Sequence, residues 1–285
     1  MEKNVRFVSF ALTLLVFGAL TSCKKDQEEV KPSFQQDSEA ASATLEVVAE
    51  VEALNTMVLS LSEQNNSAGG RRAAIQETDC GIITYQVDNS THFGTITVDY
   101  GSGQQCPGEG LRKGKIIFTF SAAASEGGFW DIAAQFVGYE ADGKKLDGKY
   151  TVNVSYDQAA QSFNYLYTFK DAVLTYQDGS KVSWTSRYEW KLKIVAGKKE
   201  GDMPVANVEL TGGLSGTSRQ GKTFSADITS PLIVDSACEW GVTKGLYLIK
   251  SQGHSEATYD FGNGACDNVA TLTINGQTQQ FSVVD

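Results

Sequence analysis

Prolines, histidines and clusters of basic residues are scarce in this chain. It has four prolines and two histidines among 285 residues, and its formal net charge is −10. Because no cluster of Lys and Arg is present to face a phosphate backbone, nucleic-acid binding is not expected. The phosphate-loop pattern and the Gly-x-Ser-x-Gly elbow of α/β hydrolases are both missing. No motif therefore assigns a catalytic reaction, and we predict a protein that is not an enzyme.

Closely spaced cysteine pairs are also missing. The chain has five cysteines, and no two of them are separated by only two residues, as in the usual half of a structural zinc site. Cysteine-bound metal is therefore not expected, and we predict no metal and no cofactor.

A secretory signal is present at the N-terminus. Lys3 and Arg6 precede an apolar run, Phe7–Leu20. This run is too short to span a membrane as a stable helix. The run ends in LTSC, which resembles a bacterial lipobox. The resemblance implies a signal peptide over residues 1–22 and lipidation of Cys23. Several acyl chains would then hold the protein on a membrane without crossing it.

The residues that follow, 23–36, are polar and charged and lack an apolar face, so they predict a disordered tether. The run KKDQEE, Lys24–Glu29, resembles the acidic export signal that sends Bacteroidetes lipoproteins to the outside of the outer membrane. A solubilising linker is the alternative interpretation.

Residues 37–65 predict one amphipathic helix, with Asp37 or Ser38 as its N-terminal cap. Apolar residues recur at steps of four and three, which places them on one stripe that packs on the body of the protein or on a partner helix. This stripe contains Val47, Val51, Leu54, Val58 and Leu61, widened by Val48, Ala53 and Met57. Residues 66–79 are rich in Gly and polar residues, and predict a linker.

From Cys80 to the end the apolar residues alternate with polar ones, most clearly over Lys181–Ile194. We predict a mainly β protein over 80–285, an antiparallel β-sandwich-like domain of roughly a dozen strands, with one N-terminal α-helix. Dipeptides that favour tight hairpins separate the apolar runs. They are Asp142-Gly143, Asp147-Gly148, Asp178-Gly179 and Asn275-Gly276.

An internal duplication is indicated by the four remaining cysteines. Each pair brackets a first strand, a turn and a second strand that ends in Asp-aromatic-Gly-x-Gly. The two related units extend over about 80–195 and 205–285. Because the protein is exported, the symmetry of the repeat favours two local disulfides. These are Cys80 to Cys106 and Cys238 to Cys266.

The repeated Asp-aromatic-Gly-x-Gly segments allow two interpretations. Asp99 with Glu109, or Asp260 with Asp267 and Asn263, could supply oxygens to Ca²⁺, yet neither loop has the dense alternating acids of an EF-hand. We favour the second interpretation, in which each Asp accepts hydrogen bonds from the backbone of the turn and the glycines adopt positive φ.

The histidines and the aromatic residues give weaker indications. His92 and His254 lie at similar places in the two units, and a grouping with Asp and Ser remains open. Tryptophans and tyrosines could form an exposed platform for sugars or a protein, but in alternating strands most face the core. The tryptophans are Trp130, Trp184, Trp190 and Trp240.

Several segments of the β domain resemble a family of uncharacterised Bacteroidetes outer-membrane lipoproteins. They are GTITVDYGSG…GLRKGKIIFTF (Gly94–Phe120), DGSKVSWTS (Asp178–Ser186), LSGTSRQGKTFSADITSPL (Leu214–Leu232) and YDFGNGACDNVATLTINGQ (Tyr259–Gln277). The resemblance covers nearly all of Cys80–Asp285. It implies location and fold, and it contributes no catalytic residue. The extra QQ and Pro around Cys106 depart from the repeat.

Together these patterns predict an uncharacterised lipoprotein, anchored in the outer membrane through Cys23 and exposed at the cell surface. We expect a non-enzymatic binding or structural module whose partner is a glycan or an outer-membrane protein, with no nucleic-acid partner. The alternative is a surface hydrolase acting on glycans or peptides.

Overall fold

The computed structural model describes residues 32–67, 73–78, 80–88, 93–107, 110–122, 130–200, 203–235, 238, 241–267 and 269–282. Within these residues, the helix α1 (Pro32–Ser67) is followed by fifteen strands. These are β1 (Ala73–Thr78), β2 (Gly81–Asp88), β3 (Phe93–Asp99), β4 (Gln104–Cys106), β5 (Gly110–Ala122), β6 (Trp130–Ala141), β7 (Lys144–Asp157), β8 (Ser162–Thr175), β9 (Lys181–Glu200), β10 (Met203–Thr217), β11 (Thr223–Asp235), β12 (Val242–Ser251), β13 (Ala257–Asn263), β14 (Val269–Ile274) and β15 (Gln277–Ser282).

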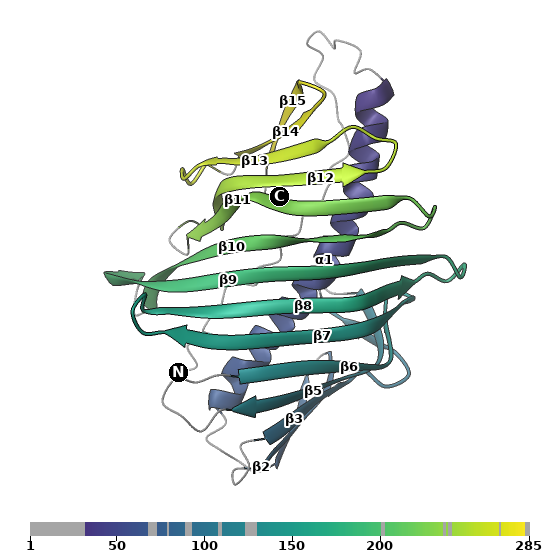
Figure 1. Ribbon diagram of the computed structural model, residues 1–285. Coiled ribbons are helices and arrows are strands. Elements are labelled where there is room, and N and C mark those ends of the chain that lie inside the picture. The colour runs from purple at the N-terminus through teal and green to yellow at the C-terminus, as the bar shows by residue number, and fades with distance from the viewer. Residues whose placement is uncertain are drawn as a thin grey trace.

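The strands form one antiparallel sheet in which almost every strand pairs with its neighbours in sequence (Figure 1). Only β4 lies off this path, paired with β5. Tight turns explain the simple order, because Asp142-Gly143 and Asn275-Gly276 both have positive φ and join β6 to β7 and β14 to β15. The dipeptide Asp147-Gly148, predicted as a turn, instead lies inside β7, at a β-bulge opposite β8.

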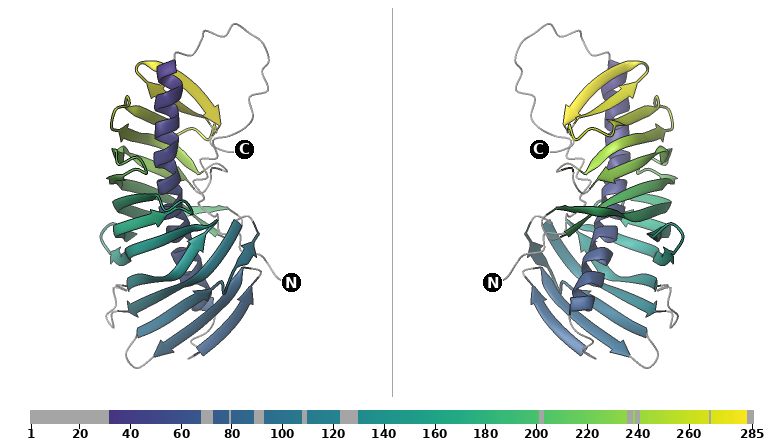
Figure 2. Two further views of the ribbon diagram at one scale, coloured as in Figure 1. Left: turned by 90° about the vertical axis from the view of Figure 1, so that its right-hand side faces the viewer. Right: turned by 90° about the vertical axis from the view of Figure 1, so that its left-hand side faces the viewer.

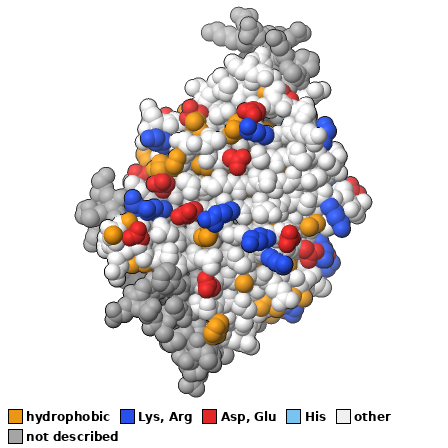
Figure 3. Space-filling model, viewed as in Figure 1, with side chains coloured by type: hydrophobic (Ala, Val, Ile, Leu, Met, Phe, Trp, Pro, Cys, Tyr) orange, Lys and Arg blue, Asp and Glu red, His pale blue; other side chains and the backbone are white. Residues whose placement is uncertain are grey.

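The two faces of the sheet differ as the alternation predicts. In β9, Val182, Trp184, Tyr188 and Trp190 are buried, and the odd-numbered residues between them are exposed. Ser186, which interrupts the apolar pattern, is buried with them. The sheet curves around α1 (Figure 2). The buried side chains of the strands belong to the same hydrophobic core as those of α1. The outer face carries interspersed positive and negative side chains (Figure 3).

The helix α1 lies on the concave face and crosses the strands (Figures 1 and 2). Its N-terminal end is near β14 and its C-terminal end is near β5 (Figure 1). Most of the predicted stripe is buried. The buried members are Val47, Val48, Val51, Leu54 and Val58. Ala53 is exposed, contrary to the prediction, and Met57 is half-buried, whereas the side chain of Leu61 lies outside the described residues.

The predicted fold class, mainly antiparallel β with an N-terminal helix, is confirmed. The strands belong to a single sheet, and α1 occupies the position that a second sheet would have in a sandwich. The two predicted units are not separated in space, because β9 pairs with β10 across the predicted boundary at 195–205.

Two predicted boundaries were wrong. The helix begins at Pro32, within the predicted tether, because Pro is well suited to the first helical position. The predicted linker 66–79 contains β1, which pairs with β2 along its length and forms one edge of the sheet. The predicted signal peptide and Cys23 lie outside the described residues.

Candidate functional site

The two predicted disulfides are present. Cys80 is bonded to Cys106 and Cys238 to Cys266, with Cα atoms 4.6 and 5.4 Å apart. The first bridge joins the segment before β2 to the segment after β3. The second joins the segment before β12 to the segment after β13. The two disulfide-closed strand pairs therefore have the same strand order and the same disulfide position, as expected for an internal duplication.

The repeated aspartates, Asp99 and Asp260, each stabilise a turn at the end of the second strand of a disulfide-closed pair. The Oδ1 atom of Asp99 accepts a hydrogen bond from the N–H of Gly101 (2.9 Å), and Oδ1 of Asp260 accepts one from Gly262 (2.8 Å). Both glycines have positive φ, which a side chain would strain. The predicted role of the two aspartates as turn formers is confirmed.

The predicted alternative was a calcium site at these turns. Asp267 accepts a hydrogen bond from the N–H of Val269 (3.2 Å), and Glu109 lies outside the described residues. Among the residues that the structure describes, no three side chains of His, Cys, Asp or Glu are grouped closely enough to hold a metal ion.

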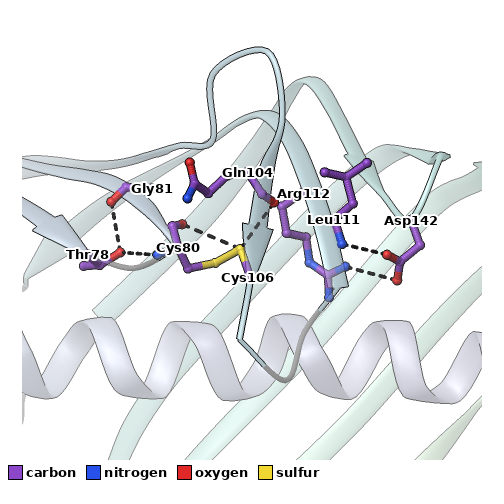
Figure 4. Close-up of a disulfide and its surroundings, with 8 residues drawn as sticks. All are labelled: Thr78, Cys80, Gly81, Gln104, Cys106, Leu111, Arg112 and Asp142. Atoms are coloured by element: carbon purple, nitrogen blue, oxygen red, sulfur yellow. Dashed lines mark hydrogen bonds and ion pairs between the residues drawn. A yellow bond between two sulfur atoms is a disulfide. The ribbon is translucent and has the colours of Figure 1, made fainter.

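The first disulfide is set among further polar contacts (Figure 4). The hydroxyl of Thr78 donates to the carbonyl of Gly81 (2.9 Å) and accepts from the N–H of Cys80 (3.1 Å). On the other side, Asp142 accepts from the N–H of Leu111 (2.7 Å) and pairs with Arg112 (3.5 Å). In each of these contacts a side chain holds the backbone or the side chain of a neighbouring segment, so this region is a structural corner.

A His, Asp and Ser grouping does occur, at the N-terminal part of α1. Nδ1 of His254 donates to Oδ1 of Asp37 (3.1 Å), and Ser255 donates to Asp37 through both its hydroxyl and its N–H. Burial alone would raise the pKa of Asp37, but these hydrogen bonds and the neighbouring His254 outweigh it and lower the pKa below its usual value.

The arrangement differs from that of a hydrolytic triad. The hydroxyl of Ser255 is bonded to Asp37, and it accepts a further hydrogen bond from Asn275 (2.6 Å). A catalytic serine would instead face the second nitrogen of the histidine. The grouping attaches α1 to the β12–β13 turn. His92 lies outside the described residues. Asp37 was predicted as the cap of the helix but lies inside it, since α1 begins at Pro32.

A second polar attachment lies further along α1. Nζ of Lys144 is 2.8 Å from Oε1 of Glu46 and 3.3 Å from Oε1 of Glu50. Lys144 follows the β6–β7 turn, so this ion pair joins α1 to another strand end. With Asp37, His254 and Ser255, these residues form what we call the rim of the α1–sheet interface.

The sequence favoured tryptophans that face the core over an exposed aromatic platform, and the described tryptophans do face the core. Trp184 and Trp190 are 3% and 5% exposed and face the core, as alternation in β9 favours. The side chains of Trp130 and Trp240 lie outside the described residues.

Polar residues are also buried beneath α1, and the sequence analysis did not identify them. Asn55 is fully buried, and its Oδ1 accepts a hydrogen bond from the hydroxyl of Tyr150 (2.7 Å). One helical turn away, Glu52 is 8% exposed, and burial raises its pKa from 4.5 to about 7. On the sheet beneath, the hydroxyls of Tyr188 and Tyr247 are hydrogen-bonded to each other (3.0 Å).

Glu52 lines a cavity of about 40 Å³ between α1 and strands β9–β13. Its aromatic walls are Tyr188, Trp190, Tyr247 and Phe261, and the remaining walls are mostly aliphatic side chains of β10 and β11. We call Glu52, Asn55, Tyr150 and this cavity the centre of the interface. A signal for it existed in the sequence, because Glu52 and Asn55 lie beside the apolar stripe.

Within the described residues, no helix combines the length and the apolar character that a membrane crossing requires. No protein-family model, no curated protein and no solved structure matches this chain. Its function must therefore be argued from its own residues.

Proposed function

We propose that this chain is a lipid-anchored lipoprotein of the outer membrane, exposed at the cell surface, which acts as a non-enzymatic binding or structural module. The order of its segments supports this proposal. A basic start, an apolar run and LTSC precede a short polar segment, and the folded part then begins with α1 at Pro32. Lipidation of Cys23 would place the sheet close to the membrane surface.

The outer face of the sheet carries the binding part of the proposal. Among the described elements none packs on this face, whereas α1 lies on the opposite one (Figure 2). Along β9 its exposed residues include Lys181, Thr185, Arg187 and Glu189. Interspersed charges of both signs suit a polar partner, such as a surface glycan or an outer-membrane protein.

The anchor is tested with Cys23→Ala, which removes the thiol that would be acylated. The variant should accumulate as an uncleaved precursor without lipid, measured by intact mass and by partition into detergent. Ser22→Ala keeps a small residue before the Cys and serves as the control. Normal cleavage and lipid attachment in Cys23→Ala would disprove the lipoprotein proposal.

Surface exposure is tested by adding protease to intact cells. The wild-type protein should be degraded, and replacement of Asp26, Glu28 and Glu29 by Ala should protect it if the acidic run is an export signal. Full protection of the wild type would place the protein inside the outer membrane. Equal degradation of both proteins would favour the solubilising linker.

Partner binding is tested on the outer face. Arg187→Glu combined with Lys191→Glu reverses charge on β9 without altering the concave face. Native gels of envelopes in mild detergent should show loss of a larger complex, or a glycan array should show loss of signal. Glu39→Lys changes an exposed residue of α1 and should have no effect. Unchanged behaviour of the double variant would exclude this face.

A further inference from the structure

Glu52 is a buried acid with no basic partner among the described residues. The basic side chains that contact α1 are engaged at the rim, Lys144 with Glu46 and Glu50, and His254 with Asp37. None of the ion pairs formed by described residues includes Glu52. Its carboxyl does have one polar neighbour, the side chain of Asn55, which lowers its pKa by less than burial raises it. A carboxylate that is taken out of water without a cation beside it is costly, so an arriving cation would be stabilised there.

The cavity beside Glu52 offers a second feature that favours a cation. Tyr188, Trp190, Tyr247 and Phe261 line it, and aromatic faces attract a desolvated ammonium group through their quadrupole. The rest of the lining is aliphatic, which suits the alkyl part of a small molecule.

The size of the cavity limits the ligand. Its volume of about 40 Å³ is well above the roughly 10–15 Å³ that a single water needs. The cavity therefore suits a ligand of only a few non-hydrogen atoms.

We propose that the cavity between α1 and β9–β13 is a binding site for a small alkylammonium ion, with Glu52 as its counter-ion and the aromatic side chains around it. This site is independent of the lipid anchor and of the outer face of the sheet. It lies on the concave side, so binding there would stabilise the docked position of α1.

Binding at this site is coupled to a proton. The empty site holds Glu52 with a pKa of about 7, so near neutral pH the carboxyl is protonated in part and releases its proton when the cation enters. The other titratable groups facing Glu52 are Tyr150, Tyr167, Tyr188 and Tyr247. Burial raises the pKa of each tyrosine, so all four stay neutral and Glu52 alone sets the pH dependence.

The test compares two probes of equal size, isopropylammonium chloride and isopropanol. Binding to the purified full-length chain in a nonionic detergent is followed by calorimetry and by tryptophan fluorescence, because Trp190 lines the cavity. Limits on binding per atom put the Kd of such a probe between about 0.05 and 100 mM. At pH 8 we expect the ammonium ion to bind at least about tenfold more tightly than the alcohol. At pH 5.5 this preference should largely disappear.

Two variants test whether Glu52 causes the preference for the ammonium ion over the alcohol. Glu52→Gln keeps the size of the side chain and should make the two probes bind equally at pH 8. Glu39→Gln removes an exposed acid from the same helix and should retain the preference of the wild type. Circular dichroism verifies that both variants are folded.

Three results would overturn the proposal. They are equal binding of the two probes by the wild type, an unchanged preference in Glu52→Gln, and no saturable binding of isopropylammonium up to about 100 mM. Because the probes act on the concave side, these results are separate from those that test Cys23 or the outer face.

Discussion

The rim and the centre of the α1–sheet interface shift the pKa of an acidic side chain in opposite directions. At the rim, Asp37 receives hydrogen bonds from Ser255 and His254, and its pKa is lowered. At the centre, burial raises the pKa of Glu52 to about 7. The same helix is therefore stabilised by ionisation at one point and destabilised by it at another. Docking of α1 should be strongest at mildly acidic pH, between the two titrations.

The largest expected effect follows from Glu52→Gln. The folded protein holds the proton of Glu52 more tightly than the unfolded chain, so stability falls as the pH rises from 4.5 to about 7. This rise in pKa corresponds to about 3 kcal/mol. The variant should lose that pH dependence and be more stable than the wild type at pH 8. Urea unfolding at pH 5 and 8 measures the free energy of unfolding of both proteins. An equal change of this free energy with pH in both would contradict the difference between rim and centre.

The next effect is expected at the rim, from Asp37→Asn. Hydrogen bonds to a charged group contribute about 1.5–3 kcal/mol, and we expect a loss of about 2 kcal/mol at neutral pH. In the wild type this stabilisation is present above the usual pKa of 3.8 and is lost as the pH falls below it. Unfolding curves at pH 7 and 3 should differ less in the variant. Hydrogen exchange at residues 34–41 should increase, and unchanged exchange would contradict an attachment at this point.

A smaller effect is expected from Tyr150→Phe at the centre. The change removes the donor to Oδ1 of Asn55 and leaves that buried acceptor without its partner. We expect a loss of about 1 kcal/mol, independent of pH between 5 and 8. Tyr259→Phe is the control, at a buried tyrosine of β13 whose hydroxyl has no hydrogen bond among the described residues. Equal stability of the two variants would show that Asn55 is satisfied in another way.

The smallest effect is expected from Lys144→Met. Its side chain is 21% exposed, and the pair with Glu46 and Glu50 lies at the surface of the interface. Partly exposed ion pairs contribute up to about 1 kcal/mol and weaken with salt. A denaturation series at low and high salt should show the difference shrinking as salt rises. A larger loss of stability that does not depend on salt would show that Lys144 acts as a buried residue, like those of the centre.

Much of the sheet was predictable because its signals are local. Alternation in β9 reports which side chains are buried, and Asp142-Gly143 and Asn275-Gly276 report where strands turn. The disulfides were predictable because each joins cysteines within one repeated unit. Even the extra residues around Cys106 have a local outcome, the short strand β4 paired with β5.

The α1–sheet interface was not predictable in the same way. Helical periodicity identified the apolar stripe, but it could not show that α1 is deeply embedded enough to bury Glu52 and Asn55 as well. The contact between Asp37 and His254 joins residues 217 positions apart, and no pattern along the chain reports such a pair. The strand β1 was missed because its pairing with β2 determines its structure.

The order of the strands has a consequence for how the molecule folds. Each strand pairs with the one made just before it, so the sheet can grow step by step from the N-terminal side with short loop closures. The helix comes first in the chain, yet its N-terminal part needs β11–β14 for its packing and the β12–β13 turn for Asp37. During synthesis or export, this part of α1 can therefore dock only after nearly the whole chain has emerged. Complete docking of α1 is thus a late step of assembly, and a chain that lacks its last strands would leave the N-terminal part of α1 without its packing partners and exposed to chaperones and proteases.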